Sequence, residues 1–293
     1  MSEYKKFIKK IALGTVQFGM DYGISNDSGK IKSEQVAAIL NEASHAGIDM
    51  LDTAVAYGES EATIGMALAS ISRQFDIVSK FPPNIPPEQF HSVIQQSLKR
   101  LKSKRIKGFL AHSFELFKQE KIRQNLIIAK KEGLIGQTGV SVYNPKEISW
   151  LLDKDINFDI VQLPFSIFDR RFVPLFPALK EKNVEIHVRS VFLQGLYFMD
   201  PNNLPAHFIS IKSRLIELKH LVKNNHIPLS ALLLNDALMQ KEIDKVVIGV
   251  TSKAELKENI NAINYLEKSI LLREKLNTFS ITDEQILQPI NWK

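Results

Sequence analysis

The chain is 293 residues long, 44% of them hydrophobic and 24% charged, with a mean hydropathy of −0.09. This composition is sufficient for a packed globular core, and the absence of cysteine excludes disulfides, thiol nucleophiles and thiolate zinc sites. No apolar stretch approaches the roughly 18–20 residues of a membrane span, and no signal-peptide segment follows the N-terminus. We therefore expect a cytoplasmic protein with no membrane partner.

The net charge of +6 raises the question of a nucleic-acid partner. The densest basic cluster, residues 99–107, ends a predicted helix and enters a predicted strand. Cations favour a helix C-terminus, and neither interleaved aromatic residues nor a DNA-binding motif accompany the cluster. We interpret it as a solvated helix end and expect no nucleic-acid partner.

Strand-like apolar runs alternate with segments of helical spacing along the chain. The predicted strands are residues 7–15, 48–54, 75–80, 105–112, 135–142, 158–164, 184–191 and 243–250. The predicted helices are residues 33–45, 59–69, 87–101, 118–131, 145–153, 173–182 and 252–265, with an inserted helical region at 205–224 and 229–240. Ser33 and Asn144 predict helix N-caps, and Gly47 predicts a left-handed helix end.

Eight strands in alternation with helices fit either an open doubly wound sheet or a closed barrel. The open sheet usually has a Gly-rich turn after its first strand, and residues 13–19 lack that spacing. The glycines of residues 133–139 run from a helix end into a strand, the reverse of the order that a dinucleotide turn requires. The prediction is therefore an α/β fold, a (β/α)8 TIM barrel, that forms one domain over residues 1–293.

Four polar residues end or follow the predicted strands. Asp52, Lys80 and His112 lie at the ends of three apolar runs, and Tyr57 follows Asp52 by five residues. Carboxyl ends of parallel strands meet at one face of a barrel, so these side chains are expected to gather there. Alone, each has an ordinary explanation, such as a surface tyrosine or a structural histidine.

Together the four residues suit carbonyl reduction. Hydride addition to a carbonyl needs an acid that protonates the developing alkoxide. Tyrosine, with a pKa near 10, serves if adjacent positive charge lowers that pKa. Lys80 is expected to supply the charge, Asp52 to hold Lys80, and His112 to hydrogen-bond the substrate oxygen.

The sequence resembles the aldo-keto reductase superfamily along nearly its whole length. The matching segments are residues 13–15, 51–54, 57–58, 79–80, 111–112, 139–141, 161–162, 189–190, 194–196, 248–249 and 258–259. The resemblance implies a barrel that binds NAD(P)H across its C-terminal mouth, with Asp52, Tyr57, Lys80 and His112 as the catalytic residues. It implies that the cofactor is bound by Gly14, Thr15, Ser141, Gln162, Arg189, Ser190, Phe192, Gln194, Gly249, Thr251, Ser252, Lys253, Glu258 and Asn259.

The chain departs from the family pattern at three positions. Val142 replaces an asparagine that contacts the carboxamide, and Arg189 replaces an aromatic residue that stacks on the nicotinamide. Glu255 replaces an arginine that binds the 2′-phosphate, and its carboxylate would repel that phosphate. Lys253 and the helix N-terminus are expected to compensate. NADP(H) is therefore favoured over NAD(H), with use of NADH or of both left open.

Other site chemistry is less well supported. No two of the seven histidines are within two residues of each other, so no metal is expected. His187 is expected to be packed and hydrogen-bonded, and Asp169, Arg170 and Arg171 to form internal ion pairs. Trp292 is expected to be a packing residue, although a place in the substrate-pocket wall stays open.

The expected function is reversible reduction of an aldehyde, ketone or sugar carbonyl. One alternative is a redox-responsive or regulatory barrel that binds the cofactor with little turnover, and another is an aldolase that uses Lys80. The short C-terminal segment, residues 270–293, predicts a shallow pocket for a small or sugar-like carbonyl. The expected oligomeric state is a monomer or a small homo-oligomer.

Overall fold

The computed structural model describes residues 4–24, 29–71 and 74–292. Within these residues eight parallel strands form a closed barrel in sequence order, because β1 pairs with both β2 and β8. This confirms the predicted TIM barrel. The strands are β1 (Ile11–Gly14), β2 (Met50–Asp52), β3 (Asp76–Phe81), β4 (Ile106–Ala111), β5 (Ile135–Ser141), β6 (Ile160–Pro164), β7 (Glu185–Arg189) and β8 (Lys245–Gly249).

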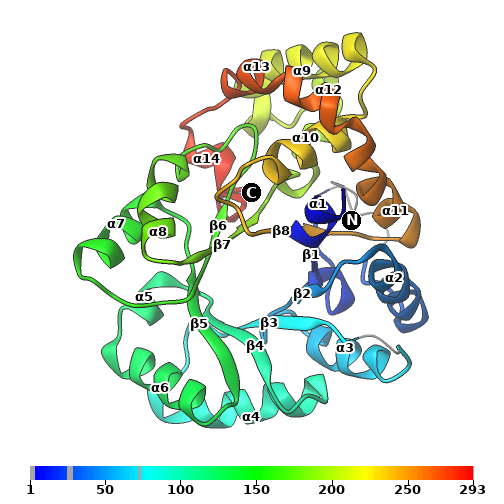
Figure 1. Cartoon of the computed structure of the whole chain (residues 1–293). Helices are drawn as coiled ribbons and strands as arrows, with labels where there is room; N and C mark the ends of the chain where they lie inside the picture. Colours follow the sequence, from blue (N-terminus) through cyan, green and yellow to red (C-terminus); the bar gives the residue numbers. More distant parts are fainter. Residues whose placement is uncertain (1–3, 25–28, 72–73, 293) are drawn as a thin grey trace.

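Helices surround the barrel (Figure 1). Those between strands are α2 (Ser33–Ala46), α3 (Ser60–Leu68), α4 (Phe90–Leu101), α5 (Phe114–Phe117), α6 (Glu120–Lys131), α7 (Pro145–Asp153), α8 (Phe176–Glu181), α9 (Lys212–Asn225) and α10 (Leu229–Leu238). Those after β8 are α11 (Lys253–Asn261), α12 (Leu266–Leu271), α13 (Arg273–Asn277) and α14 (Glu284–Leu287). None of the described helices is long and apolar enough to span a bilayer.

Local signals set several helix ends. The predicted helix start at Asn144 is confirmed, and there Asn144 and Glu147 form a capping box. Gly47 ends α2 with a left-handed φ of 97°. The predicted N-cap at Ser33 is wrong, because α2 begins at Ser33 itself and Lys32 precedes it without a side-chain cap.

The first predicted strand is also wrong over its first half. Tyr4–Lys10 forms the helix α1, and the strand starts only at Ile11. Phe7 and Ile8 pack together against the core, which is possible on one face of a helix but not on one face of a strand. The Nζ atom of Lys10 donates to the carbonyl oxygens of Leu238 and Gln240, which ties α1 to the turn that leads into β8.

The alternation of side chains along the strands sorts them into two cores. One cluster consists of Ala12, Met50, Val78, Leu110 and Ile160, which we place inside the barrel. The intervening residues of the strands belong to the larger cluster beneath the helices. Two residues after the members of this cluster from β2, β3, β4 and β6, the side chains become polar. These polar residues are Asp52, Lys80, His112 and Gln162, which follow Met50, Val78, Leu110 and Ile160 by two positions each.

Candidate active site

Asp52 and Lys80 form a buried ion pair at the C-terminal mouth of the barrel. The Nζ atom of Lys80 lies 2.7 Å from Oδ1 of Asp52 and donates to the carbonyl oxygen of Thr53 at 2.8 Å. The second oxygen of Asp52, Oδ2, accepts from the side-chain amide of Gln162 at 2.7 Å. A buried pair needs such hydrogen bonds to its remaining atoms, and here the carbonyl of Thr53 and the amide of Gln162 each supply one.

Tyr57 lies on the loop between β2 and α3, where this loop crosses the loop after β1. Its ring centroid is 5.3 Å from Nζ of Lys80 and 5.8 Å from the ring of His112, which it meets edge-on. The crossing depends on Gly19, because a Cβ atom there would lie 1.8 Å from the carbonyl oxygen of Tyr57. The structure thus brings the four predicted catalytic residues together.

The electrostatics differ from the sequence-based expectation at Tyr57. Burial, followed by the charge of Asp52, raises the pKa of Tyr57 above its ordinary value. The charge of Arg189 opposes this rise in the pKa. Burial, with a further effect of Lys80, lowers the pKa of His112 to about 4. At neutral pH the site therefore presents a protonated phenol and a neutral imidazole.

A cavity of about 520 Å³ extends from these residues to the start of α11. Of the residues predicted for the site, Lys80, Ser252 and Lys253 do not line it. Lys80 is buried behind Asp52, Ser252 caps α11, and Lys253 pairs with Glu42. The others line it: Gly14, Thr15, Asp52, Tyr57, His112, Ser141, Gln162, Arg189, Ser190, Phe192, Gln194, Gly249, Thr251, Glu258 and Asn259.

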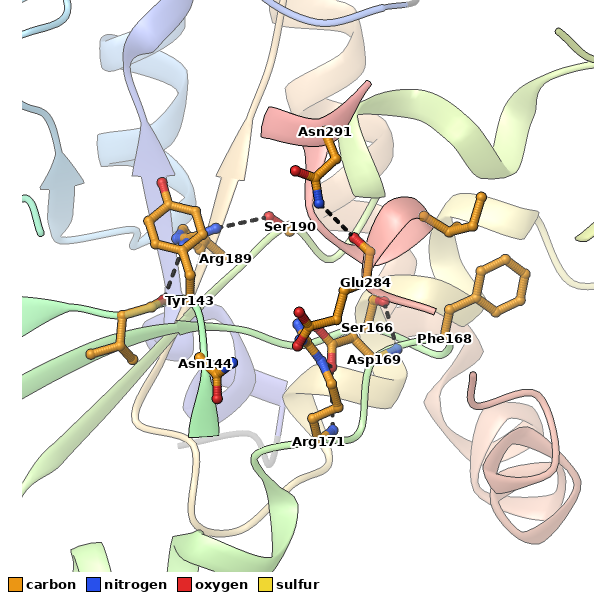
Figure 2. A network of polar contacts seen from close by, with 12 residues as sticks. Tyr143, Asn144, Ser166, Phe168, Asp169, Arg171, Arg189, Ser190, Glu284 and Asn291 are labelled. Carbon is orange, nitrogen blue, oxygen red and sulfur yellow. Dashed lines mark hydrogen bonds and ion pairs between the residues drawn. The ribbon is translucent and has the colours of Figure 1, made fainter. Parts of the chain in front are cut away.

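Arg189 stacks on Tyr143, a cavity residue that the sequence argument missed. Its guanidinium carbon lies 4.1 Å from the ring centroid, and Figure 2 shows the two side chains face to face. Nη2 of Arg189 also donates to the carbonyl oxygen of Val142 at 3.1 Å. Tyr143 follows Ser141 by two residues just past the end of β5, and that position was the available signal. The stack holds a flat cation in the cavity wall.

The loop after β7 adopts an uncommon backbone. Ser190, Leu193 and Gln194 have φ values of 65°, 45° and 51°, although none of them is glycine. Such strain concentrates at binding sites, where surrounding contacts maintain it. The side-chain amide of Gln194 donates to the hydroxyl of Tyr22 at 2.9 Å, which joins this loop to the loop after β1. Tyr22 also lines the cavity, and no sequence signal pointed to it.

Two other sequence-based expectations concern His187 and Trp292. His187 is fully buried, with Nε2 at 3.3 Å from Oε2 of Glu185, so it is packed and partnered as expected. Trp292 packs against Phe208 and is not in the cavity wall.

The three charged residues after β6 form internal ion pairs, as expected. Arg171 pairs with Asp169 at 2.8 Å and with Glu284 at 2.9 Å, the contacts drawn in Figure 2. Arg170 pairs with the buried Asp236 of α10 at 2.7 Å. Among the described residues, no three His, Asp or Glu side chains are grouped as metal ligands.

The chain is similar to known proteins over most of its length. Residues 10–271 match the sequence model of the aldo/keto reductase family. The chain is 27% identical over 286 residues to L-galactose dehydrogenase of Arabidopsis thaliana, which covers 89% of this chain and 87% of that protein. It is 23% identical over 308 residues to the NADH-specific methylglyoxal reductase of Escherichia coli (strain K12), and the match covers 88% of this chain and 94% of that protein.

Solved structures share the fold. The holo form of aldo-keto reductase AKR11C1 from Bacillus halodurans superposes with a TM-score of 0.73 and 21% identity, covering 94% of this chain and 95% of that one. At this identity the likeness concerns the fold alone.

Proposed function

The chain belongs to the aldo/keto reductase family and is an oxidoreductase, and from this we propose that it reversibly reduces the carbonyl of a small aldehyde, ketone or sugar to an alcohol. The proposal rests on one observation: Tyr57 lies beside both His112 and the Asp52–Lys80 pair, at the wall of a single cavity. The presence of a sugar dehydrogenase and a methylglyoxal reductase among the relatives supports a small carbonyl substrate.

The cavity suits a nicotinamide dinucleotide, which supplies the hydride when bound. It is lined by residues from Tyr57 to the first turn of α11, as an extended ligand requires, and several of its buried polar atoms have no hydrogen-bond partner among the described residues. These atoms include Oε1 of Gln17 and Nδ2 of Asn259. Buried polar atoms are normally paired, so ligand groups are the natural partners. We assign binding to the cavity residues given above, with Ser141 and Gln162 at the nicotinamide end.

Each catalytic residue has one task in this proposal. Tyr57 donates its hydroxyl proton to the carbonyl oxygen as negative charge develops there, and its raised pKa keeps that proton in place at neutral pH. His112, neutral because its pKa is about 4, donates an N–H hydrogen bond to the same oxygen and orients it. The Asp52–Lys80 pair holds Nζ of Lys80 near the Tyr57 ring. In the oxidative direction Tyr57 takes the proton back.

The aldolase alternative loses support from the position of Lys80. A Schiff base needs a neutral amine that reaches substrate. Lys80 instead is 1% exposed, donates to Asp52 and Thr53, and does not line the cavity.

The test of the proposal is Tyr57→Phe. We expect turnover of NADH or NADPH with methylglyoxal or L-galactose to fall at least about 100-fold, because the acid is lost. Cofactor affinity, followed by nucleotide fluorescence, should stay within about threefold. Tyr143→Phe is the matched control, since it removes a cavity hydroxyl but keeps the ring that stacks on Arg189. Wild-type turnover in Tyr57→Phe would contradict the role of Tyr57.

On sequence grounds we also propose that the protein works in the cytoplasm, as a monomer or small homo-oligomer, without a metal, nucleic-acid or membrane partner. The sequence favours NADP(H) over NAD(H). The charge at the α11 end of the cavity bears directly on that preference.

A further inference from the structure

The α11 end of the cavity is acidic. Its wall includes the carboxylates of Glu255 and Glu258, together with Thr251 and Asn259. Among the described residues that line the cavity, the cationic side chain is Arg189, which lies at the end of β7 beside Tyr143. A ligand that extends from Tyr57 to α11 therefore meets negative charge at its far end.

The carboxylate of Glu255 is held in place by the first turn of α11. Its Oε2 atom accepts from the backbone N–H and the hydroxyl of Thr251, at 2.7 and 2.9 Å. In return, Oγ of Ser252 accepts from the backbone N–H of Glu255 at 3.1 Å. These bonds satisfy N–H groups that a helix N-terminus otherwise offers to an external anion. Oε1 of Glu255 takes part in none of them and can accept from a ligand hydroxyl.

The lysine expected to offset Glu255 points elsewhere. Nζ of Lys253 lies 3.0 Å from Oε2 of Glu42 on α2, and Nζ of Lys257 lies 3.8 Å from the same atom. Pairing with Lys253 lowers the pKa of Glu42. Both lysine side chains are about half exposed, and exposed pairs are weak. We therefore base the expected cofactor preference on the carboxylate of Glu255 and not on the direction of the Lys253 side chain.

We propose that Glu255 makes the protein select NAD(H) and reject NADP(H). This inference rests on the proposed function, because a nicotinamide beside Tyr57 places the adenosine at the α11 end. A ribose with free hydroxyls donates hydrogen bonds to a carboxylate, whereas a 2′-phosphate brings two like charges to it. This proposal departs from the preference for NADP(H) that we predicted from the sequence.

The experiment compares NADH and NADPH binding by nucleotide fluorescence in the wild type and in Glu255→Gln. Glutamine keeps the capping bonds, so α11 should stay intact. We expect the wild type to bind NADH at least about tenfold more tightly than NADPH, and Glu255→Gln to narrow that ratio at least about tenfold by improving NADPH affinity. Glu42→Gln is the control. It frees Lys253 but leaves the carboxylate of Glu255, and should change the ratio less than about threefold.

The outcomes separate this proposal from the proposed function. Two results would overturn the role of Glu255 and leave the reductase proposal intact. In the first, the wild type binds both nucleotides and binds NADPH as tightly as NADH or more tightly. In the second, Glu255→Gln leaves the ratio of the two affinities unchanged. A larger effect of Glu42→Gln would assign the selection to Lys253 and also overturn it. The absence of binding by either nucleotide would overturn both proposals.

Discussion

Gln162 links the cavity wall to the catalytic ion pair. Because the carboxylate of Asp52 only accepts hydrogen bonds, the amide nitrogen of Gln162 faces Asp52 and its carbonyl oxygen is left for a ligand. We predict that Gln162→Leu lowers the free energy of unfolding by about 1–3 kcal/mol, since a buried carboxylate loses a donor. We also predict a loss of kcat, because Asp52 then holds Lys80 less firmly.

A matched control exists elsewhere in the barrel. Gln137 donates its side-chain amide to Glu185 at 2.6 Å, and neither residue lines the cavity. Gln137→Leu should cost similar stability in urea unfolding but leave kcat nearly unchanged. Equal losses of kcat in Gln137→Leu and Gln162→Leu would show that Gln162 acts only through general stability.

His112 makes stability depend on pH. Its pKa is about 4 in the fold, whereas an unfolded histidine titrates near 6.5. The unfolded chain therefore binds more protons between these values, and this contribution to stability, complete above about pH 6.5, is lost as the pH falls through 4. We predict that the wild type loses up to about 3 kcal/mol more than His112→Gln between pH 7 and pH 4. If the free energy of unfolding, measured with denaturant, depends on pH in the same way in the wild type and in His112→Gln, this prediction is contradicted.

The loop after β6 is anchored to α10 by a buried charge pair. Nη2 of Arg170 lies 2.7 Å from Oδ2 of Asp236, and the Arg170 guanidinium also stacks on Phe165. Burial raises the pKa of Asp236, although Arg170 opposes that shift. Removing one partner of such a pair leaves an uncompensated buried charge, which costs more than removing both.

The corresponding prediction compares single and double variants. Arg170→Met should lower the free energy of unfolding by about 3–5 kcal/mol, because Asp236 stays buried without its cation. The double variant Arg170→Met, Asp236→Leu should recover most of that loss in urea unfolding. If the double variant is as unstable as the single one, packing by Arg170 rather than its charge anchors the loop.

For the molecule as a whole, we propose that residues 1–293 fold as one domain. The two tryptophans report on separate regions, since Trp150 of α7 packs on Phe114 and Trp292 packs on Phe208 near the C-terminus. The variants Trp150→Phe and Trp292→Phe each retain one tryptophan. We predict that in each variant the unfolding midpoint measured by tryptophan fluorescence equals the midpoint measured by far-UV circular dichroism. Midpoints that differ between fluorescence and circular dichroism in either variant would argue for separate folding units.

The barrel and its site were largely predictable from local pattern. In strands of period two, Asp52 and Lys80 lie near the carboxyl ends of β2 and β3 and on the same face as Met50 and Val78, which the sequence pattern indicates. The helix start at Asn144 was readable for the same reason, because the residues that mark it lie within one helical turn. Tyr143 was missed although it follows Ser141 closely, since it lies beyond the strand and its role arises from stacking on Arg189.

Contacts between distant segments decided the rest. Residues 7–10 form a helix because Lys10 reaches the turn before β8, and Lys253 turns away from the cavity because Glu42 of α2 is beside it. The pKa of Tyr57 rises because burial and the charge of Asp52 outweigh the opposing charge of Arg189. Periodicity and capping depend on neighbours along the chain, so the sequence alone predicts them. Burial, ion-pair choice and side-chain direction depend on which segments the closed barrel brings together, and they become known only with the fold.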